Sequence, residues 1–400
     1  MPTSPTLTNK PATTPRLIGY YLALCSVGLS GILGPTLSGL AAQTHSTLSQ
    51  ISVLFVVKSI GYIVGSLLSG RAYDRWPGHP IIVFVILALG AGLALTPLAP
   101  WLVLLALVIG VVGFAEGAID VGTNTLIVWT YGDGVGPYMN GLHFAFGVGA
   151  FVGPLVVAQA LAWSGGIAWA YWAVALLIVP AALWLARLPS PASHAPTQAT
   201  PTEAVNYKLI ALFVACFFFY VGGEVSFGAW VYTYAKRLGL ADSVTAAYLT
   251  SVFWGALTLG RLMAIPIAAR FRPRAIMLVN LAGCLLCVGL ALVFPTSAFI
   301  LWVSAMGAGL SMASIFPTLM NLAGRRMRVT GLVTSFFFVG GSLGAMIWPW
   351  IIGQLFEPIG PRVTMATVFL VVLLETAAFV ALLIYAPRPV VAQVVPAESR

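Results

Sequence analysis

The chain alternates long runs of apolar residues with short segments that carry Gly, Pro or charged side chains. A helix needs roughly 20 apolar residues, at about 1.5 Å each, to cross the hydrocarbon core of a bilayer. Twelve runs reach that length, so we predict an all-α membrane protein with twelve transmembrane helices. The predicted spans cover residues 17–41, 50–73, 78–99, 101–130, 140–163, 166–188, 207–235, 243–268, 273–294, 297–322, 329–354 and 361–386.

The composition indicates that the lipid bilayer surrounds most of the chain. Hydrophobic residues make up 60% of it and charged residues only 7%, which is far more apolar than a water-soluble globule. The first run ends in Leu40-Ala41-Ala42-Gln43, which resembles a signal-peptide cleavage site. That run is too long for a cleaved leader and eleven more follow it, so we interpret it as a first span.

The formal net charge of +9 would suit a nucleic-acid-binding protein, but the basic residues follow the predicted topology instead. With the N-terminus inside, the cytoplasmic side receives Lys10, Arg16, Arg71, Arg75, Arg187, Lys208, Arg270, Arg272, Arg274, Arg325, Arg326, Arg328, Arg388 and Arg400. The outer side receives only Lys236, Arg237 and Arg362. We therefore expect a multi-pass protein of the cytoplasmic membrane with both termini in the cytoplasm, and no nucleic-acid partner.

A long polar segment rich in Pro, Ser, Thr and Ala divides the twelve spans into two sets of six. The glycine and aromatic pattern of the fifth span recurs in the eleventh, which indicates two six-helix repeats. The expected organisation is a tail (1–16), an N-terminal bundle (17–188), a linker (189–206), a C-terminal bundle (207–388) and a second tail (389–400). Such repeats are typical of rocking-bundle transporters, whose binding site lies at midmembrane between the halves.

Two carboxylates and an amide recur every four residues in the fourth span: Glu116, Asp120 and Asn124. By the helical rise Glu116 lies near the bilayer centre, where a charged acid costs at least about 2.5 to 3.5 kcal/mol unless it meets water or a partner. We predict that Glu116 and Asp120 bind the coupling ion, H⁺ or Na⁺, and that Asn124 contacts substrate. The alternative is a polar network that only locks the fourth span to its neighbours.

In the seventh span, Glu224 shares a face with Tyr220 and Phe227 and is followed by Trp230. An acid among aromatic rings suits a sugar, because hydroxyls bond to carboxylates and rings cover the apolar sugar face. We therefore predict these four residues, with Asn321 of the tenth span, as substrate-binding residues. The rings could equally serve core packing.

Two basic residues fall inside spans. Depth along the helices places Lys58 near Glu224, and we predict an outer gate formed by that pair, against the alternative that Lys58 reaches the outer surface. Arg261 lies too far from Glu224 in depth to pair with it, so we assign it to the cytoplasmic gate. His143, near the cytoplasmic start of the fifth span, is either structural or a proton sensor.

The segment GRAYDRWPGHP resembles the loop motif between spans 2 and 3 of the major facilitator superfamily, although Pro77 is an insertion and His79 replaces a basic residue. The stretches GPTLSGLAAQT, EGAIDVGTN, GGEVSFGAWVYTYA and SIFPTLMNL resemble the branch of sodium-dependent glucose transporter 1 and the fucose permeases. The resemblance covers nearly the whole chain. It implies the superfamily's fold and transport activity, a coupling acid at Glu116, and an inner gate held by Asp74 and Arg75. The acid usual in the first span has no counterpart among residues 17–41.

We therefore expect a monomeric secondary transporter for a small polar solute, of the sugar class, that uses alternating access and no cofactor. The alternative of the same fold is a proton-driven drug exporter, because Gly149, Gly153 and Pro154 partly match the exporters' glycine–proline motif. Val156 and Val157 stand where that motif continues with glycine, which weakens the match. The sequence has no HExxH metal motif, and Cys284-x-x-Cys287 has no second ligand pair, so we expect neither a metal site nor an enzyme.

Overall fold

The computed structural model describes residues 13–192, 206–327 and 331–385. The predicted linker and tails lie mostly outside these residues, as do Lys10, Arg328, Arg388 and Arg400. The helices are α1 (Thr13–Leu29), α2 (Leu33–Gln43), α3 (Leu48–Ile51), α4 (Val53–Arg75), α5 (Gly78–Leu95), η1 (Thr96–Leu98), α6 (Leu102–Tyr131), η2 (Gly132–Gly134), α7 (Gly136–Ser164), α8 (Ala168–Ala186), α9 (Tyr207–Arg237), α10 (Ser243–Arg270), α11 (Pro273–Val293), α12 (Ala298–Met312), α13 (Ile315–Gly324), α14 (Gly331–Ile359) and α15 (Val363–Tyr385).

The predicted all-α membrane fold is confirmed. Within the described residues, eleven helices are long and apolar enough to cross a membrane, and a bent pair, α1 with α2, supplies the twelfth span. Most ends agree with the predicted spans to within a few residues. The largest difference is at the end of α14, which extends to Ile359 rather than to residue 354.

Two of the spans are broken, each just before a proline. The axes of α1 and α2 meet at 47°, and Pro35 lies in the first turn of α2. A proline ring clashes with the carbonyl four residues earlier, here that of Gly31, so a continuous helix is disfavoured. The same relation holds between Pro317 and Ala313, where α12 ends and α13 begins. The proline positions therefore explain both breaks.

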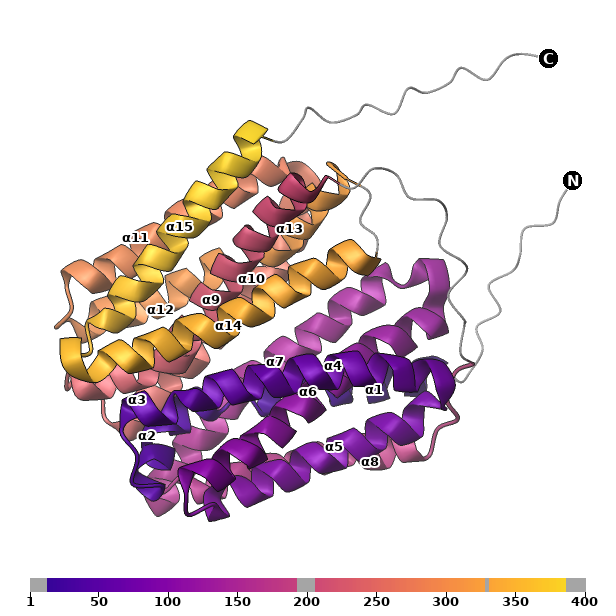
Figure 1. Cartoon of the computed structure of the whole chain (residues 1–400), viewed down its shortest axis with the longest axis horizontal. Helices are drawn as coiled ribbons and strands as arrows, with labels where there is room; N and C mark the ends of the chain where they lie inside the picture. Colours follow the sequence, from indigo (N-terminus) through magenta and orange to yellow (C-terminus); the bar gives the residue numbers. More distant parts are fainter. Residues whose placement is uncertain (1–12, 193–205, 328–330, 386–400) are drawn as a thin grey trace, which may run out of the picture.

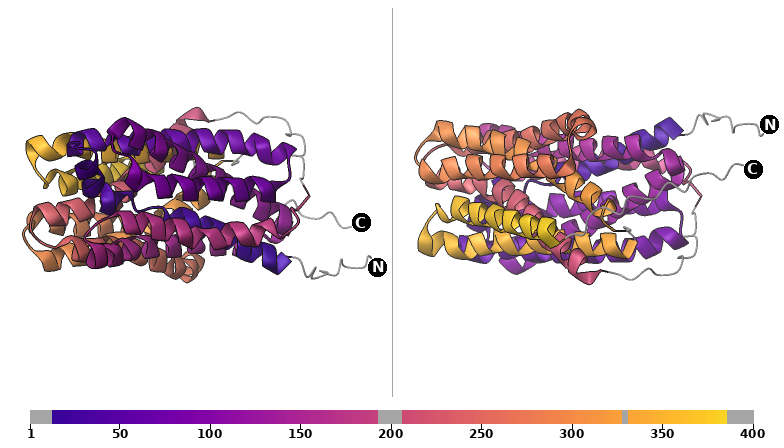
Figure 2. Two further views of the ribbon diagram at one scale, coloured as in Figure 1. Left: turned by 90° about the horizontal axis from the view of Figure 1, so that it is seen from below. Right: turned by 90° about the horizontal axis from the view of Figure 1, so that it is seen from above.

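The helices gather in two groups, which we call the N-half (α1–α8) and the C-half (α9–α15), on opposite sides of the molecule (Figure 1). The long helices run in roughly the same direction in all views (Figure 2). The start of α1 lies beside the end of α8, since Trp184 Nε1 donates to the Pro15 carbonyl at 2.9 Å. We call this end of the molecule, where α15 also ends, the termini end, and the opposite one the far end.

At the far end the two halves are in direct contact. Ser49 Oγ donates to Gln354 Oε1 at 2.7 Å, and the Leu48 amide donates to Glu357 Oε1 at 3.0 Å. The Phe55 ring of the N-half lies 6.2 Å from the Trp230 ring of the C-half. Together these contacts close the space between the halves at the far end.

Within the N-half, α4 and α6 cross very closely. A Cβ atom built on Gly65 would lie 2.9 Å from the Cα of Phe114, and one on Gly113 would lie 3.0 Å from the Cα of Lys58. Membrane helices associate through such small residues because lipid offers no hydrophobic driving force between helices. The crossing fixes Lys58 at the level of Gly113, one turn from Glu116.

We predict that Gly65→Ala destabilises the protein whereas Gly70→Ala, on the same helix, does not. The first substitution forces a methyl group into the Phe114 backbone, an overpacking that costs about 1–3 kcal/mol. Nothing lies within 4 Å of a Cβ on Gly70, so alanine there keeps or slightly raises the stability through its better helix propensity. Thermal unfolding midpoints in detergent measure the difference, and equal midpoints for the two variants would contradict the close crossing.

Candidate functional site

A cavity of about 910 Å³ lies between the halves. The predicted spans 1, 4, 7 and 10 all contribute to its wall, together with α4, α7, α10 and α14. Its lining extends to the termini end, at Asn140 near the start of α7 and Pro273 at the start of α11. Because the far end is closed, the cavity is accessible from the termini end.

Both broken spans expose their breaks to this cavity. Gly31 and Gly34 line it from the first span, and Ser314 and Pro317 line it from the tenth. Helix breaks at membrane depth are tolerated where they line a cavity, and in transporters they commonly mark the binding site. The breaks therefore agree with a solute site at this position.

Glu116 on α6 forms an ion pair with Lys58 on α4, with Lys58 Nζ 3.0 Å from Glu116 Oε1. Ser30, at the break of the first span, donates to the same oxygen at 2.5 Å. The predicted pair of Lys58 with Glu224 is therefore wrong in this conformation. The prediction estimated the depth of each residue from the end of its own helix. That estimate fails because α4 and α6 do not begin at the same level in the membrane. The glycine crossing decides the partner instead.

Asp120 lies one turn further along α6 and also faces the cavity. The Tyr62 hydroxyl donates to its Oδ2, and Asn124 Nδ2 donates to its Oδ1 at 2.8 Å. Asn124 itself is not among the residues that line the cavity. Four residues advance a helix by about 40° beyond a full turn, so Asn124 is rotated by about 80° from Glu116. Asn124 therefore positions Asp120. Contrary to the prediction, it does not face the cavity.

In the C-half, Glu224 on α9 forms an ion pair with Arg261 on α10, with Arg261 Nη2 3.6 Å from Glu224 Oε1. The predicted separation of these two residues in depth is therefore wrong. Trp254 of α10 lies level with Gly228 of α9, and counting from that contact leaves only about 4.5 Å of rise between Glu224 and Arg261. A long arginine side chain covers that distance.

The predicted aromatic substrate contacts lie elsewhere. Phe227 and Trp230 are completely buried, Tyr220 is almost so, and none of them lines the cavity. The cavity face of α9 instead carries Val221, Glu224, Val225 and Gly228. Tyr220 and Phe227 flank Glu224 on the side turned away from that face. The prediction therefore assigned the substrate contacts to the wrong side of α9.

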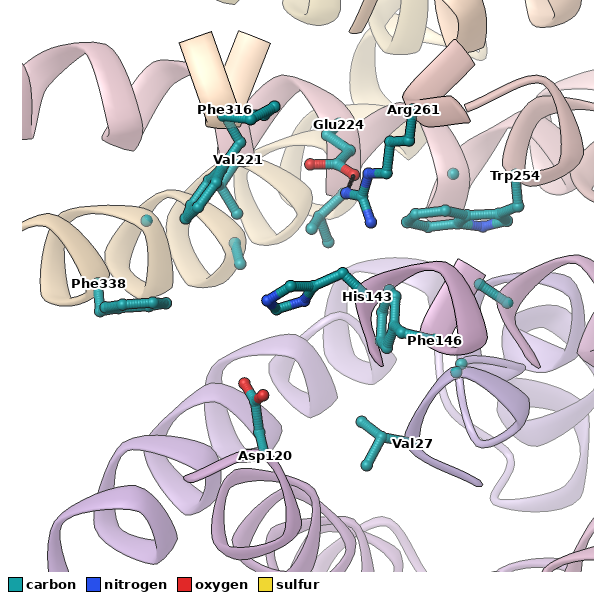
Figure 3. Close-up of a pocket in the computed structure, with 18 of the residues that line it drawn as sticks. Val27, Asp120, His143, Phe146, Val221, Glu224, Trp254, Arg261, Phe316 and Phe338 are labelled. Atoms are coloured by element: carbon teal, nitrogen blue, oxygen red, sulfur yellow. Dashed lines mark ion pairs between the residues drawn. The ribbon is translucent and has the colours of Figure 1, made fainter. Parts of the chain in front are cut away.

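Other rings and amides line the cavity. Phe146, Trp254, Phe316 and Phe338 surround it (Figure 3). The sequence pattern did not identify Phe146, Phe316 and Phe338, because a ring that faces a cavity and one that faces a core have the same helical spacing. Asn321, which is predicted to bind substrate, lines the cavity, and its Oδ1 accepts from Arg325 Nε at 2.9 Å.

His143 also lines the cavity. Its imidazole lies between Asp120 of the N-half and the Glu224–Arg261 pair of the C-half (Figure 3). In the sequence, Asn140 and His143 lie one helical turn apart at the start of an apolar run. Two polar residues on one face of this helix are the feature that could have indicated that the face lines a cavity.

Asp74 and Arg75 lie at the termini end of α4, where both side chains are exposed. Neither makes an ion pair with any other residue in the ranges that the structure describes. The inner gate implied by the resemblance thus remains a prediction for another conformation.

Comparisons with known proteins identify the family of the chain. The family model "Major Facilitator Superfamily" matches residues 20–349. Sodium-dependent glucose transporter 1A of Mus musculus is 29% identical over 379 residues, which cover 84% of this chain and 88% of the mouse protein. Sodium-dependent glucose transporter 1 of Xenopus laevis is 32% identical over 354 residues, which cover 81% of this chain and 72% of the frog protein.

The fold agrees with a solved structure as well. The nucleoside transporter NupG superposes with a TM-score of 0.72 at 15% sequence identity, covering 93% of this chain and 99% of that protein. Family model, relatives and fold agree over most of the chain. The chain therefore belongs to the major facilitator superfamily and is a secondary transporter of the membrane, not an enzyme.

Proposed function

We propose that the protein is a symporter that carries a sugar-class solute across the cytoplasmic membrane by alternating access, with a proton as the coupling ion. The observation that carries this proposal is the arrangement of charges in the cavity. Lys58 and Glu116 on the N-half and Glu224 and Arg261 on the C-half line the same space between the halves. A solute bound there contacts both moving parts.

The cavity wall suits a neutral, hydroxyl-rich solute. Its volume of about 910 Å³ falls within the roughly 300–1,000 Å³ of small-molecule sites. Carboxylates, basic side chains and the amides of Asn140 and Asn321 offer partners for hydroxyl groups, and Trp254 and Phe338 offer faces for the apolar side of a sugar ring. The names of the mouse and frog relatives support the same substrate class.

The partners of Glu116 favour proton coupling. Its carboxylate is held by the ammonium of Lys58 and the hydroxyl of Ser30. Protonation removes the charge that holds Lys58, so proton binding and the position of Lys58 are linked. Sodium is the second candidate, supported by the relatives' names. A sodium ion would have to compete with Lys58 for the same carboxylate.

We further propose that the termini end faces the cytoplasm. Most of the described basic residues other than Lys58 and Arg261 lie there, as the positive-inside rule requires, and only Lys236, Arg237 and Arg362 lie at the far end. This distribution supports an inward-open conformation for the cavity. Asp74 and Arg75 would then belong to the inner gate, and the far-end contacts to the closed outer gate. One chain contains the whole cavity, which supports a functional monomer.

Reconstitution into proteoliposomes tests the function directly. We expect labelled D-glucose, or another hexose of a small panel, to accumulate against its gradient when the outside is more acidic than the inside. A proton gradient should raise the initial uptake rate at least tenfold over no gradient. Accumulation driven by sodium alone would select the second candidate. Export of a lipophilic cation with no hexose uptake would contradict the proposal.

The role of Glu116 is tested with Lys58 as its control. We expect Glu116→Gln to exchange D-glucose across the membrane but to lose uphill accumulation, because the amide resembles the protonated acid and cannot release a proton. The variant leaves Lys58 without its partner, a fault that Lys58→Met combined with Glu116→Gln removes. Uphill accumulation by this double variant would mean that Glu116 only neutralises Lys58. Asp120→Asn should behave like Glu116→Gln only if the two acids titrate as one unit.

Alternating access predicts that the far end must open during transport. Ser49→Cys with Gln354→Cys replaces a 2.7 Å hydrogen bond between the halves by an oxidisable pair. We expect oxidation to lower D-glucose uptake at least tenfold and a reductant to restore it, whereas Ser49→Cys alone should be insensitive. Unchanged uptake by fully cross-linked protein would show that the far end does not open.

A further inference from the structure

A glycine on α9 makes room for a tryptophan at the cavity wall. A Cβ atom built on Gly228 would lie 2.8, 3.0 and 3.1 Å from Cζ2, Cε2 and Nε1 of Trp254, which comes from α10. These distances are shorter than the 3.4–4 Å of an ordinary van der Waals contact. The edge of the indole ring therefore occupies the space that a side chain at position 228 would need.

The ring has free space on one side only. Both Gly228 and Trp254 line the cavity, and the half-buried indole points toward the space between the halves (Figure 3). Away from the cavity, the ring meets the completely buried Phe253, whose ring centroid is 5.2 Å from that of Trp254. A ring displaced from α9 would therefore move into the cavity.

This contact lies at the closed end of the cavity. Ala229, the next residue of α9, also lines the cavity, and Gly34 of the N-half packs against its backbone. A Cβ atom on Gly34 would lie 2.7 Å from the Cα of Ala229, so the halves touch there without space for a side chain. A solute beside Trp254 thus occupies the last position that is reachable from the termini end. The same position is the first to become reachable when the far end opens.

Charged groups lie one helical turn from this position. Glu224 precedes Gly228 by four residues on the cavity face of α9, a rise of about 6 Å, and forms the ion pair with Arg261. Hydroxyl groups of a solute beside Trp254 therefore find a carboxylate and a guanidinium on the side of the termini end. The indole ring covers apolar carbon atoms of the same solute.

We propose that Gly228 and Trp254 set the width of the solute site and thereby select the size of the sugar. The missing side chain at position 228 keeps the indole against α9, which leaves space for the hydroxymethyl group of a hexose. With alanine there, the closest contact has to lengthen from 2.8 to at least 3.4 Å, so the ring moves about 0.6 Å into the site. This inference rests on the sugar transport proposed above and names the residues that determine which sugar fits.

D-glucose and D-xylose test the proposal, because D-xylose is D-glucose without its hydroxymethyl group. A change of one carbon group in a close-fitting pocket alters discrimination by about 10–200-fold. We expect Gly228→Ala to raise the KM for D-glucose uptake at least tenfold and the KM for D-xylose uptake less than threefold. The maximal rates should stay within threefold of those of the parent protein, which shows that the variant is folded.

Gly223→Ala is the matched control on the same helix. The nearest atom to a Cβ on Gly223 is Val371 Cγ1 at 3.5 Å, and Gly223 does not line the cavity. The control should leave both KM values unchanged.

Removing the indole shows whether the ring transmits the effect. In a Trp254→Leu background, Gly228→Ala should change the KM for D-glucose less than twofold, which makes the two substitutions strongly non-additive. Equal increases in KM for both sugars, or the same increase with and without Trp254, would overturn this inference and leave the proposed function intact. A parent protein that takes up no hexose would overturn the proposed function and this inference with it.

Discussion

A charge inside a membrane must be paired or hydrated, and this constraint organises the centre of the molecule. Both buried ion pairs join helices of the same half: Lys58 with Glu116 between α4 and α6, and Arg261 with Glu224 between α9 and α10. Breaking such a pair by removing one partner typically costs about 3–5 kcal/mol. Because neither of these two pairs crosses the cavity, the halves can move relative to one another without breaking them.

The contacts that do join the halves are weaker. Those at the far end include the hydrogen bond from Ser49 to Gln354 and that from the Leu48 amide to Glu357. The neutral bond from Ser49 to Gln354 contributes only about 0.5–1.5 kcal/mol, and the bond to the exposed Glu357 carboxylate about 1.5–3 kcal/mol, because water replaces the lost partner. The molecule thus concentrates its strong electrostatic interactions within each half and leaves exchangeable ones between them. That distribution is what a rocking motion requires.

The sequence predicted the spans well, because hydropathy and length are properties of one helix at a time. The sequence also carries a signal for the two helix breaks, because Pro35 and Pro317 disfavour a continuous helix. We did not predict the breaks, because the apolar runs continue through both prolines. The pairing of charges could not be predicted from depth. It depends on the level at which two helices cross, and that level is set by glycines such as Gly113, which admit a neighbouring backbone. Which rings face the cavity depends on the rotation of each helix about its own axis, and the spacing of residues in the sequence does not determine that rotation.

The break in the first span connects the charge at Glu116 to the backbone. Ser30 lies within hydrogen-bonding distance of two acceptors, Glu116 Oε1 at 2.5 Å and the Val27 carbonyl at 2.7 Å, but it has one hydroxyl proton to donate. An ionised Glu116 is the stronger acceptor. When Glu116 is protonated, the hydroxyl is free to satisfy the Val27 carbonyl instead, one turn before the bend. A change of charge on α6 therefore alters the hydrogen bonding of the first span at its break, where that span faces the cavity and has the least helical structure to resist bending.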